Sequence, residues 1–299
     1  MKFIEFLSFR IIVAIFKLIP FWKLYLLADI LYFFLFYVFK YRRKIAFDNI
    51  RKSFPDKAEE DITRIVKDFY RHLSDITLES IKSMSLREKV LKKHYQVKNT
   101  EIAEKYFSEG KSVLCLTSHY GNWEYGILAT NNAISHQAIA LYLPLTNKFS
   151  EHFGLKRRKR FGMKMVAVQE TKTIFEEKPL KPVAVIMAAD QSPSNLERAI
   201  WTDFLHRDTP CLHGPEAYAK KTNLPVLYLK ISKTKRGQYS LKFEELIENP
   251  IDYNSGEITK LYFERLEKDI IEKPEFWLWS HRRWKYNRES LNKQQNDKN

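Results

Sequence analysis

The sequence predicts an α/β protein with a mainly parallel central sheet flanked by helices and an N-terminal hydrophobic, membrane-anchoring helical region. Three observations predict this fold. The first forty residues are much more apolar than the rest of the chain. An amphipathic helical pattern follows them. From about residue 111, short apolar runs typical of strands buried on both faces alternate with helical patterns.

The composition is that of a folded chain with an anionic partner. Of 299 residues, 44% are hydrophobic, and 8 Gly and 11 Pro are too few for a disordered or collagen-like protein. Because 51 Lys and Arg face 36 Asp and Glu, the net charge is +15, which favours nucleic acid, a phospholipid surface or an acidic protein. The two cysteines fit neither a disulfide framework nor a zinc site, so we expect reduced thiols and no metal.

The N-terminal region contains two apolar runs, Phe3–Ile19 and Leu24–Phe39. The second run reaches only ~24 Å, whereas the two together are long enough to cross a ~30 Å hydrocarbon core as a tilted or broken helix. No small-residue cleavage site follows. The run ends in a basic cluster, which indicates a retained anchor with this end in the cytoplasm. A buried hairpin of core helices is the alternative.

The remaining elements follow in chain order. Apolar residues from Ile62 to Ile76 recur at three- and four-residue steps and predict a helix. The predicted strands are Val113–Leu116, Ala138–Leu143, Met165–Val168, Val183–Met187 and Val226–Ile231. The last predicted helix covers about Glu257–Glu272. We therefore expect an anchoring region (1–44), an α/β domain (45–288) and a polar C-terminal tail (289–299).

The most informative stretch is the turn after the first predicted strand. Gly121 suits a sharp turn and Asn122 suits the N-cap of the next helix. In one continuous helix, five steps would place His119 and Glu124 about 140° apart. With His119 at the strand end and Glu124 in the first helical turn, the two side chains can meet, at the edge where open α/β sheets bind ligands. A purely structural pair is the alternative.

This pair suggests acid–base chemistry on a hydroxyl group. A carboxylate bonded to one imidazole nitrogen fixes the ring and leaves the other nitrogen to accept a proton. No G-x-S-x-G elbow surrounds Ser118, and Cys115 lies in the middle of a strand. We therefore expect direct attack by a substrate hydroxyl rather than a covalent intermediate.

The segment Ser118–Glu124 resembles the His-x4-Asp/Glu block of the late acyltransferases of lipid A biosynthesis, within the lysophospholipid acyltransferase superfamily. Further similar blocks follow in the same order along the chain. They comprise Tyr142, Pro144 and Asn147 with Arg158, Arg160, Phe161 and Gly162; Asp190; and Pro274–Glu275 with Trp277, Trp279, His281, Arg282, Arg283 and Lys285. The resemblance extends to about Lys285.

The resemblance implies roles for the matching residues. His119 would be the general base, Glu124 the carboxylate that orients it, and Arg158 the cation that stabilises the oxyanion of an attacked thioester. The residues expected to bind substrate are Arg160, Asn122, Asn147, Asp190, His281, Arg282 and Arg283. Asp190 would position a cation of the site; a simple turn acid is the alternative.

The activity that the resemblance implies is transfer of a fatty acyl chain from acyl carrier protein or coenzyme A to a hydroxyl of a lipid A precursor. It implies the cytoplasmic face of the inner membrane, an acyl carrier protein and a membrane lipid as partners, and no cofactor. One alternative is the same transfer to a lysophospholipid, an amino-acid lipid or a phosphatidylinositol glycoside. Another is a non-catalytic protein that binds membrane or nucleic acid, although no nucleic-acid motif is found.

Overall fold

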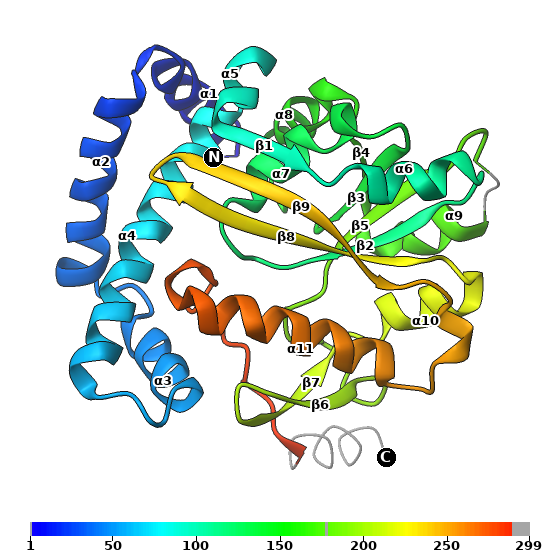
Figure 1. The fold of residues 1–299 in the computed structure, drawn as a ribbon. Helices are drawn as coiled ribbons and strands as arrows, with labels where there is room; N and C mark the ends of the chain where they lie inside the picture. The colour runs from blue at the N-terminus through cyan, green and yellow to red at the C-terminus, as the bar shows by residue number, and fades with distance from the viewer. Residues whose placement is uncertain (1, 177–178, 289–299) are drawn as a thin grey trace.

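The computed structural model describes residues 2–176 and 179–288 (Figure 1). Its helices are α1 (Lys2–Leu18), α2 (Phe21–Phe33), α3 (Arg43–Ser53), α4 (Glu59–Ser83), α5 (Glu88–His94), α6 (Glu101–Ser108), α7 (Trp123–Ala129), α8 (Lys148–Arg158), α9 (Thr171–Glu176), α10 (Gly214–Thr222) and α11 (Glu257–Glu272). Its strands are β1 (Tyr95–Lys98), β2 (Val113–Thr117), β3 (Gln137–Tyr142), β4 (Lys164–Ala167), β5 (Val183–Ala188), β6 (Ile200–Phe204), β7 (Arg207–Cys211), β8 (Val226–Lys235) and β9 (Gln238–Ile247).

The sheet confirms the predicted α/β class. Within the described residues, a seven-stranded sheet has the order β1-β9-β8-β2-β5-β3-β4. Strands β8, β2, β5, β3 and β4 are parallel, whereas β9 is antiparallel to β8 and β1 is parallel to β9. The five predicted strands correspond to β2, β3, β4, β5 and β8. A separate antiparallel pair, β6 and β7, was not predicted.

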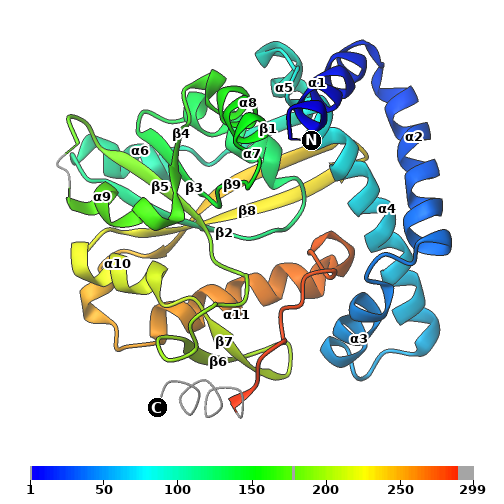
Figure 2. The ribbon, with the colours of Figure 1, turned by 180° about the vertical axis from the view of Figure 1, so that it is seen from behind.

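Helices cover both faces of this sheet (Figures 1 and 2). Neighbouring residues on β9 point to opposite faces, as pleating requires. Glu245 accepts a hydrogen bond from Tyr106 of α6, whereas Glu244 accepts one from Arg265 of α11. The sheet therefore separates a layer that contains α6 from a layer that contains α11, and its central strands β2 and β5 are almost completely buried.

Helix α4 confirms the predicted amphipathic helix and extends it at both ends. It lies between α2 and the edge of the sheet (Figure 2). Its buried face carries apolar residues from Ile62 to Leu78, but also the polar residues His72, Asp75 and Glu79. His72 and Glu79 connect α4 to the loop after β2, whereas Asp75 connects it to Lys233 and Arg236 of the β8–β9 hairpin.

The N-terminal helices expose a broad apolar surface. The segment Phe21–Val38, formed by α2 and a π-helical turn, is long and apolar enough to cross a membrane, and only 17% of it is buried. Leu24 and Ala28 of α2 pack on Leu78 of α4, while most other large apolar side chains of α1 and α2 are exposed. The alternative of a buried hairpin is therefore wrong for these helices.

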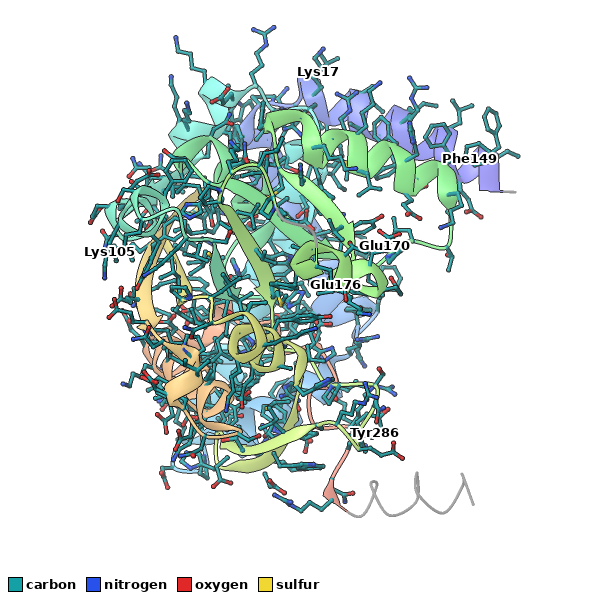
Figure 3. All side chains as sticks on the ribbon, turned by 90° about the vertical axis from the view of Figure 1, so that its right-hand side faces the viewer. Lys17, Lys105, Phe149, Glu170, Glu176 and Tyr286 are labelled. Carbon is teal, nitrogen blue, oxygen red and sulfur yellow. The ribbon has the colours of Figure 1, made fainter. Side chains whose placement is uncertain are left out.

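Helix α1 lies along α8 through aromatic contacts (Figure 3). The ring of Phe6 is 5.7 Å from that of Phe149 and 6.2 Å from that of Phe153. The first helix is thus packed against the basic segment that follows β3. The domain boundaries at residues 44 and 288 stay predictions, and the predicted tail (289–299) lies outside the described residues.

Candidate active site

The loop between β2 and α7 has the predicted turn and cap. Gly121 has φ of +60°, and a Cβ atom there would lie 2.6 Å from Cγ2 of Ile231, so only glycine fits. The Oδ1 atom of Asn122 accepts a hydrogen bond from the backbone N–H of Tyr125 at 2.9 Å, which caps α7. This turn places His119 at the carboxyl edge of the sheet.

The carboxylate that holds His119 is Asp190, and the predicted pairing with Glu124 is wrong. Nδ1 of His119 lies 2.8 Å from Oδ1 of Asp190. The Oδ2 atom of Asp190 accepts two further hydrogen bonds of 3.0 Å, from the backbone N–H of His119 and from Nε1–H of Trp277. Glu124 is instead paired with Arg158.

The parallel pairing of β2 with β5 explains this arrangement. Thr117 is the register partner of Ala188. His119 and Asp190 each follow two residues later, so both chains leave the sheet at the same edge. Glu124 lies beyond the turn and in α7, where its side chain points to α8 instead.

The hydrogen bonds fix the tautomer of His119. An ionised carboxylate only accepts hydrogen bonds, so Nδ1 carries the proton and Nε2 carries the lone pair. The Gln191 side-chain amide donates to Nε2 at 3.2 Å. The His119 side chain is 21% exposed. If the hydroxyl group of a substrate displaced the Gln191 amide, its proton would therefore face the lone pair of Nε2.

Burial and charge act in opposite directions on this pair. Burial favours a neutral imidazole, but the Asp190 charge and hydrogen bond, with the Glu124 charge, raise the pKa of His119 above its ordinary value. Burial also opposes ionisation of Asp190, yet the charge and hydrogen bonds of His119 and the Trp277 hydrogen bond hold the pKa of this carboxyl below its ordinary value. The aspartate is therefore ionised at neutral pH.

Arg158 and Glu124 form a bidentate ion pair beside the imidazole. Nη2 of Arg158 lies 2.7 Å from Oε1 of Glu124, and Nε lies 3.2 Å from Oε2. The Trp123 ring, next to Glu124 in α7, packs edge-on against His119 with 5.2 Å between centroids. Because the two side chains are 29% and 21% exposed, the guanidinium remains accessible from solvent.

The C-terminal residues expected to bind substrate occupy different environments. His281 lies at the site, where its Nε2 accepts a hydrogen bond from the Ser192 backbone N–H at 3.3 Å. Burial lowers the pKa of His281 to about 4, so this ring is neutral at pH 7. Arg282 is exposed. Arg283 is completely buried and donates to the Pro210 carbonyl at 2.8 Å, which indicates a structural role.

Two other residues expected to bind substrate make structural contacts. Asn147 caps α8 by accepting a hydrogen bond from the Ser150 backbone N–H at 3.3 Å, and it donates to Glu5 of α1 at 3.2 Å. Arg160 donates to the Ser83 carbonyl at the end of α4 at 2.5 Å. These contacts hold α8 against α1 and α4.

Four residues near His119 escaped sequence analysis as site residues. They are Gln191, Trp277, and His72 and Glu79 of α4. The last two are seven positions apart, so they lie on one face, which they share with Asp75 and with buried apolar residues. Polar residues at helical spacing on an apolar stripe were the signal for them. Trp277 lies in one of the blocks that resemble the family, but the pattern does not show that it donates to Asp190, and Gln191 gave no signal.

The fold and the site fit an enzyme, because a histidine held by a buried aspartate at the carboxyl edge of the sheet is an arrangement typical of general bases. Among residues 2–176 and 179–288, no three His, Cys, Asp or Glu side chains are grouped as metal ligands. The chain belongs to the bacterial lipid A biosynthesis acyltransferases, whose family profile matches residues 2–286.

Two curated relatives agree with this family. The chain is 22% identical over 249 residues to the lipid A biosynthesis palmitoleoyltransferase of Escherichia coli (strain K12), which covers 82% of this chain and 79% of that protein. It has the same identity and coverage with the lipid A biosynthesis acyltransferase of Shigella flexneri. The family predicted from the sequence motifs is thus confirmed, and the protein is an acyltransferase of lipid A biosynthesis.

Proposed function

We propose that the protein transfers a fatty acyl chain from an acyl thioester to a hydroxyl group of a lipid A precursor at the cytoplasmic face of the inner membrane. The observation that carries this proposal is the His119–Asp190 pair, whose Nε2 lone pair is available at the edge of the sheet. Family membership supports acyl transfer as the reaction.

In the proposed mechanism, Nε2 of His119 takes the proton of the acceptor hydroxyl while the hydroxyl oxygen attacks the thioester carbonyl. The tetrahedral intermediate collapses, the carbon–sulfur bond breaks, and the leaving thiolate takes the proton back. Asp190 stabilises the imidazolium between these steps. Cys115 is buried and burial raises the pKa of its thiol, which supports direct attack without a cysteine nucleophile.

Arg158 is suited to stabilise the oxyanion. We expect Arg158→Ala to lower kcat by ~10² to 10³-fold with little change in the KM for the thioester, because the guanidinium acts on charge that develops only in the transition state. Steady-state acyl transfer measures both constants. The matched control is Arg64→Ala, an exposed arginine on α4 that pairs with Asp61. A wild-type kcat in Arg158→Ala would contradict this role.

The apolar surface of α1 and α2 supports binding to a bilayer. A contiguous apolar surface of this size is unusual for a soluble monomer. The residues that expose large apolar side chains in α1 and α2 are Phe3, Ile4, Leu7, Ile11, Ile12, Ile15, Leu18, Trp22, Leu26, Leu27, Ile30 and Phe33. Burying them in lipid would keep the site next to the membrane that holds the acceptor.

A basic face next to this apolar surface supports an acidic carrier protein as the donor. We define the basic face as Lys17, Arg87, Lys89, Lys92, Lys93, Lys156, Arg157 and Lys159. Arg160 joins the end of α8 to the end of α4, and Lys82 joins the end of α4 to the Lys17 carbonyl at 3.1 Å. Basic side chains project from this end of the molecule around Lys17 (Figure 3).

The basic face fits a protein surface better than a lipid surface. This holds for the part on and beside α5, because no large apolar side chain is exposed from residue 42 to residue 142, whereas α1 and α8 expose Leu18 and Phe149. The last turn of α8 presents Lys156 and Lys159 to solvent and Arg158 to Glu124. A carrier docked on this turn would therefore deliver its thioester next to the site.

Charge reversal tests this docking. We expect Lys89→Glu/Lys93→Glu to raise the KM for an acyl carrier protein thioester about tenfold, with an unchanged kcat and an unchanged KM for acyl-coenzyme A. The matched control is Lys221→Glu/Lys268→Glu on α10 and α11, away from α5 (Figure 1). An equal rise in KM in the two double variants, or an equal rise for the two thioester donors, would contradict docking at this face.

The function as a whole is tested by an assay of the purified full chain in detergent. The donors are acyl carrier protein and coenzyme A thioesters, and the acceptors are a tetra-acylated lipid A precursor and a lysophospholipid. We expect a mass spectrum in which only the lipid A precursor gains an acyl group. Acylation of the lysophospholipid alone would replace the proposed acceptor, and no transfer to either lipid would refute the proposed function.

A further inference from the structure

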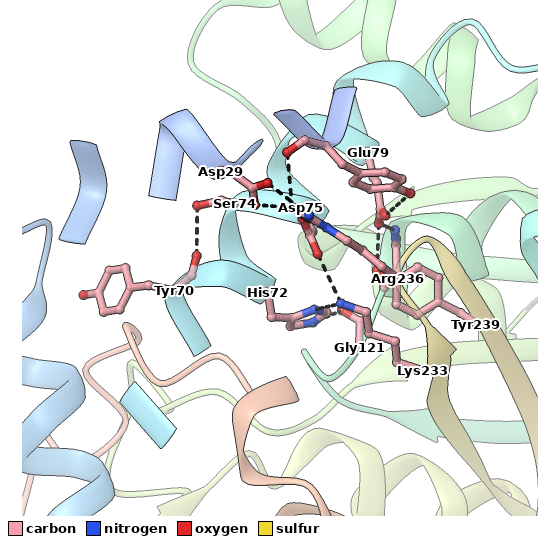
Figure 4. Close-up of polar contacts among 12 residues, drawn as sticks. Asp29, Tyr70, His72, Ser74, Asp75, Glu79, Gly121, Lys233, Arg236 and Tyr239 are labelled. Atoms are coloured by element: carbon pink, nitrogen blue, oxygen red, sulfur yellow. Dashed lines mark hydrogen bonds and ion pairs between the residues drawn. The ribbon is translucent and has the colours of Figure 1, made fainter. Parts of the chain in front are cut away.

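A buried polar cluster lies behind the site, between α2, α4, the loop after β2 and the β8–β9 hairpin (Figure 4). At its centre is Glu79, which is completely buried. Its Oε1 atom accepts a hydrogen bond from the Tyr25 hydroxyl at 2.9 Å. Its Oε2 atom accepts two, from Nδ2 of Asn122 at 2.7 Å and from the Tyr239 hydroxyl at 2.8 Å. Three different elements thus converge on one carboxyl group.

Asn122 contacts Glu79 through its side-chain nitrogen, while its side-chain oxygen caps α7. Its Oδ1 accepts from the Tyr125 backbone N–H, while its Nδ2 donates to Glu79. With both ends of the amide engaged, the side chain has one orientation. The next two residues, Trp123 and Glu124, are those that contact His119 and Arg158.

His72 holds the same loop one residue earlier. Its Nε2 lies 3.3 Å from the Gly121 carbonyl oxygen, and its Nδ1 lies 3.5 Å from Nζ of Lys233. Burial, reinforced by the charge of Lys233, keeps the pKa of His72 well below its ordinary value. The ring is therefore neutral, and it donates from Nε2 to the loop and accepts on Nδ1. Two side chains of α4 thus fix consecutive loop residues.

A buried carboxyl group without a cationic partner lowers the stability of the fold, so its presence here calls for another explanation. None of the described lysines or arginines forms an ion pair with Glu79, and burial together with the nearby Asp75 raises the pKa of this carboxyl. An apolar side chain of similar size would stabilise such a position at least as well. Unlike an apolar side chain, the carboxyl group accepts three hydrogen bonds and so fixes the orientation of the three side chains that donate them.

We propose that Glu79 is a positioning residue for acyl transfer, which holds Asn122 and thereby the first turn of α7 that presents Trp123 to His119 and Glu124 to Arg158. This inference rests on the proposed function. Glu79 itself touches neither of the catalytic side chains, so its effect is on their geometry. A misplacement of about 1 Å at a reacting group costs ~10²-fold in rate.

An exchange of the two interacting groups tests the proposal. In Asn122→Asp the new carboxylate still caps α7, because aspartate and asparagine are equally good caps, but it cannot donate to Glu79. Because one shared proton would restore the contact between the two carboxyl groups, kcat is measured up to the highest pH at which wild type is stable. We expect kcat to fall by ~10²-fold, with an unchanged KM for the thioester. In Glu79→Gln/Asn122→Asp an amide again donates to a carboxylate, and we expect most of kcat to return.

The matched control is Tyr239→Phe, which removes one hydrogen bond from Glu79 without changing Asn122 and should keep the wild-type kcat. The melting temperature of every variant is measured alongside kcat and KM. If kcat per folded molecule is the same in Asn122→Asp as in wild type, or if the exchange restores the melting temperature without restoring kcat, the positioning role is refuted. Failure of the proposed function differs, because wild type and His119→Ala would then both lack acyl transfer.

Discussion

Replacing His119 with alanine is expected to lower kcat by ~10² to 10⁴-fold, because the acceptor hydroxyl would lose the group that takes its proton. Arg158 would still stabilise the oxyanion, so a residual rate above that of the uncatalysed reaction should persist. Initial rates of acyl transfer from a thioester to the lipid A precursor measure the effect.

His152→Ala is the matched control, since His152 is an exposed histidine of α8. It should retain wild-type kcat. Because His119→Ala leaves the buried Asp190 without its ring partner, the melting temperature of the variant is measured as well and kcat is given per folded molecule. Turnover within threefold of wild type in His119→Ala would contradict the general-base mechanism.

Asp190→Asn is expected to produce the second large effect, a fall in kcat of ~10² to 10⁴-fold, because an amide does not enforce the Nδ1–H tautomer or stabilise the imidazolium. The pH dependence should change as well. Asp190 stabilises the protonated ring and so raises the pKa of His119. Without this charge the pKa falls, so the rise of kcat/KM with pH should move to lower pH.

The measurement is the pH profile of kcat/KM for wild type and Asp190→Asn, with Glu124→Gln as the comparison. Glu124 also raises the pKa of His119 through its charge, but it makes no hydrogen bond with the ring and contributes less than Asp190. Its variant should therefore shift the profile in the same direction by a smaller amount. A larger shift in Glu124→Gln than in Asp190→Asn would restore Glu124 as the principal partner of His119.

The central strands could be predicted because their burial leaves a simple pattern. Each of β2 and β5 is a continuous apolar run, since helices cover both faces of the sheet. Strand β9 escaped prediction because Lys242 and Glu244 interrupt its apolar residues. This strand lies between β1 and β8. Two of its charged side chains, Glu244 and Glu245, bond to residues of the covering helices α11 and α6.

The position of His119 could be predicted from local sequence, but its partner could not. A turn residue and a cap next to a buried strand define where the histidine lies. The partner depends on which strand is adjacent to β2, and single-sequence patterns do not determine strand order. Asp190 is 71 positions away and closes the neighbouring strand, whereas Glu124 was close only along the chain.

The contacts of α2 bear on how the enzyme can be brought into aqueous solution for study. Arg236 bridges Asp29 of α2 and Asp75 of α4 at 2.6 and 2.7 Å, and Tyr25 reaches Glu79 from the same helix. Deleting α2 would expose Asp75 and Glu79 of α4 to solvent and would remove the hydrogen bond from Tyr25 to Glu79. Truncation is therefore the wrong route to a soluble enzyme, and surface redesign of the exposed apolar side of α2, with Tyr25 and Asp29 kept, is the better one.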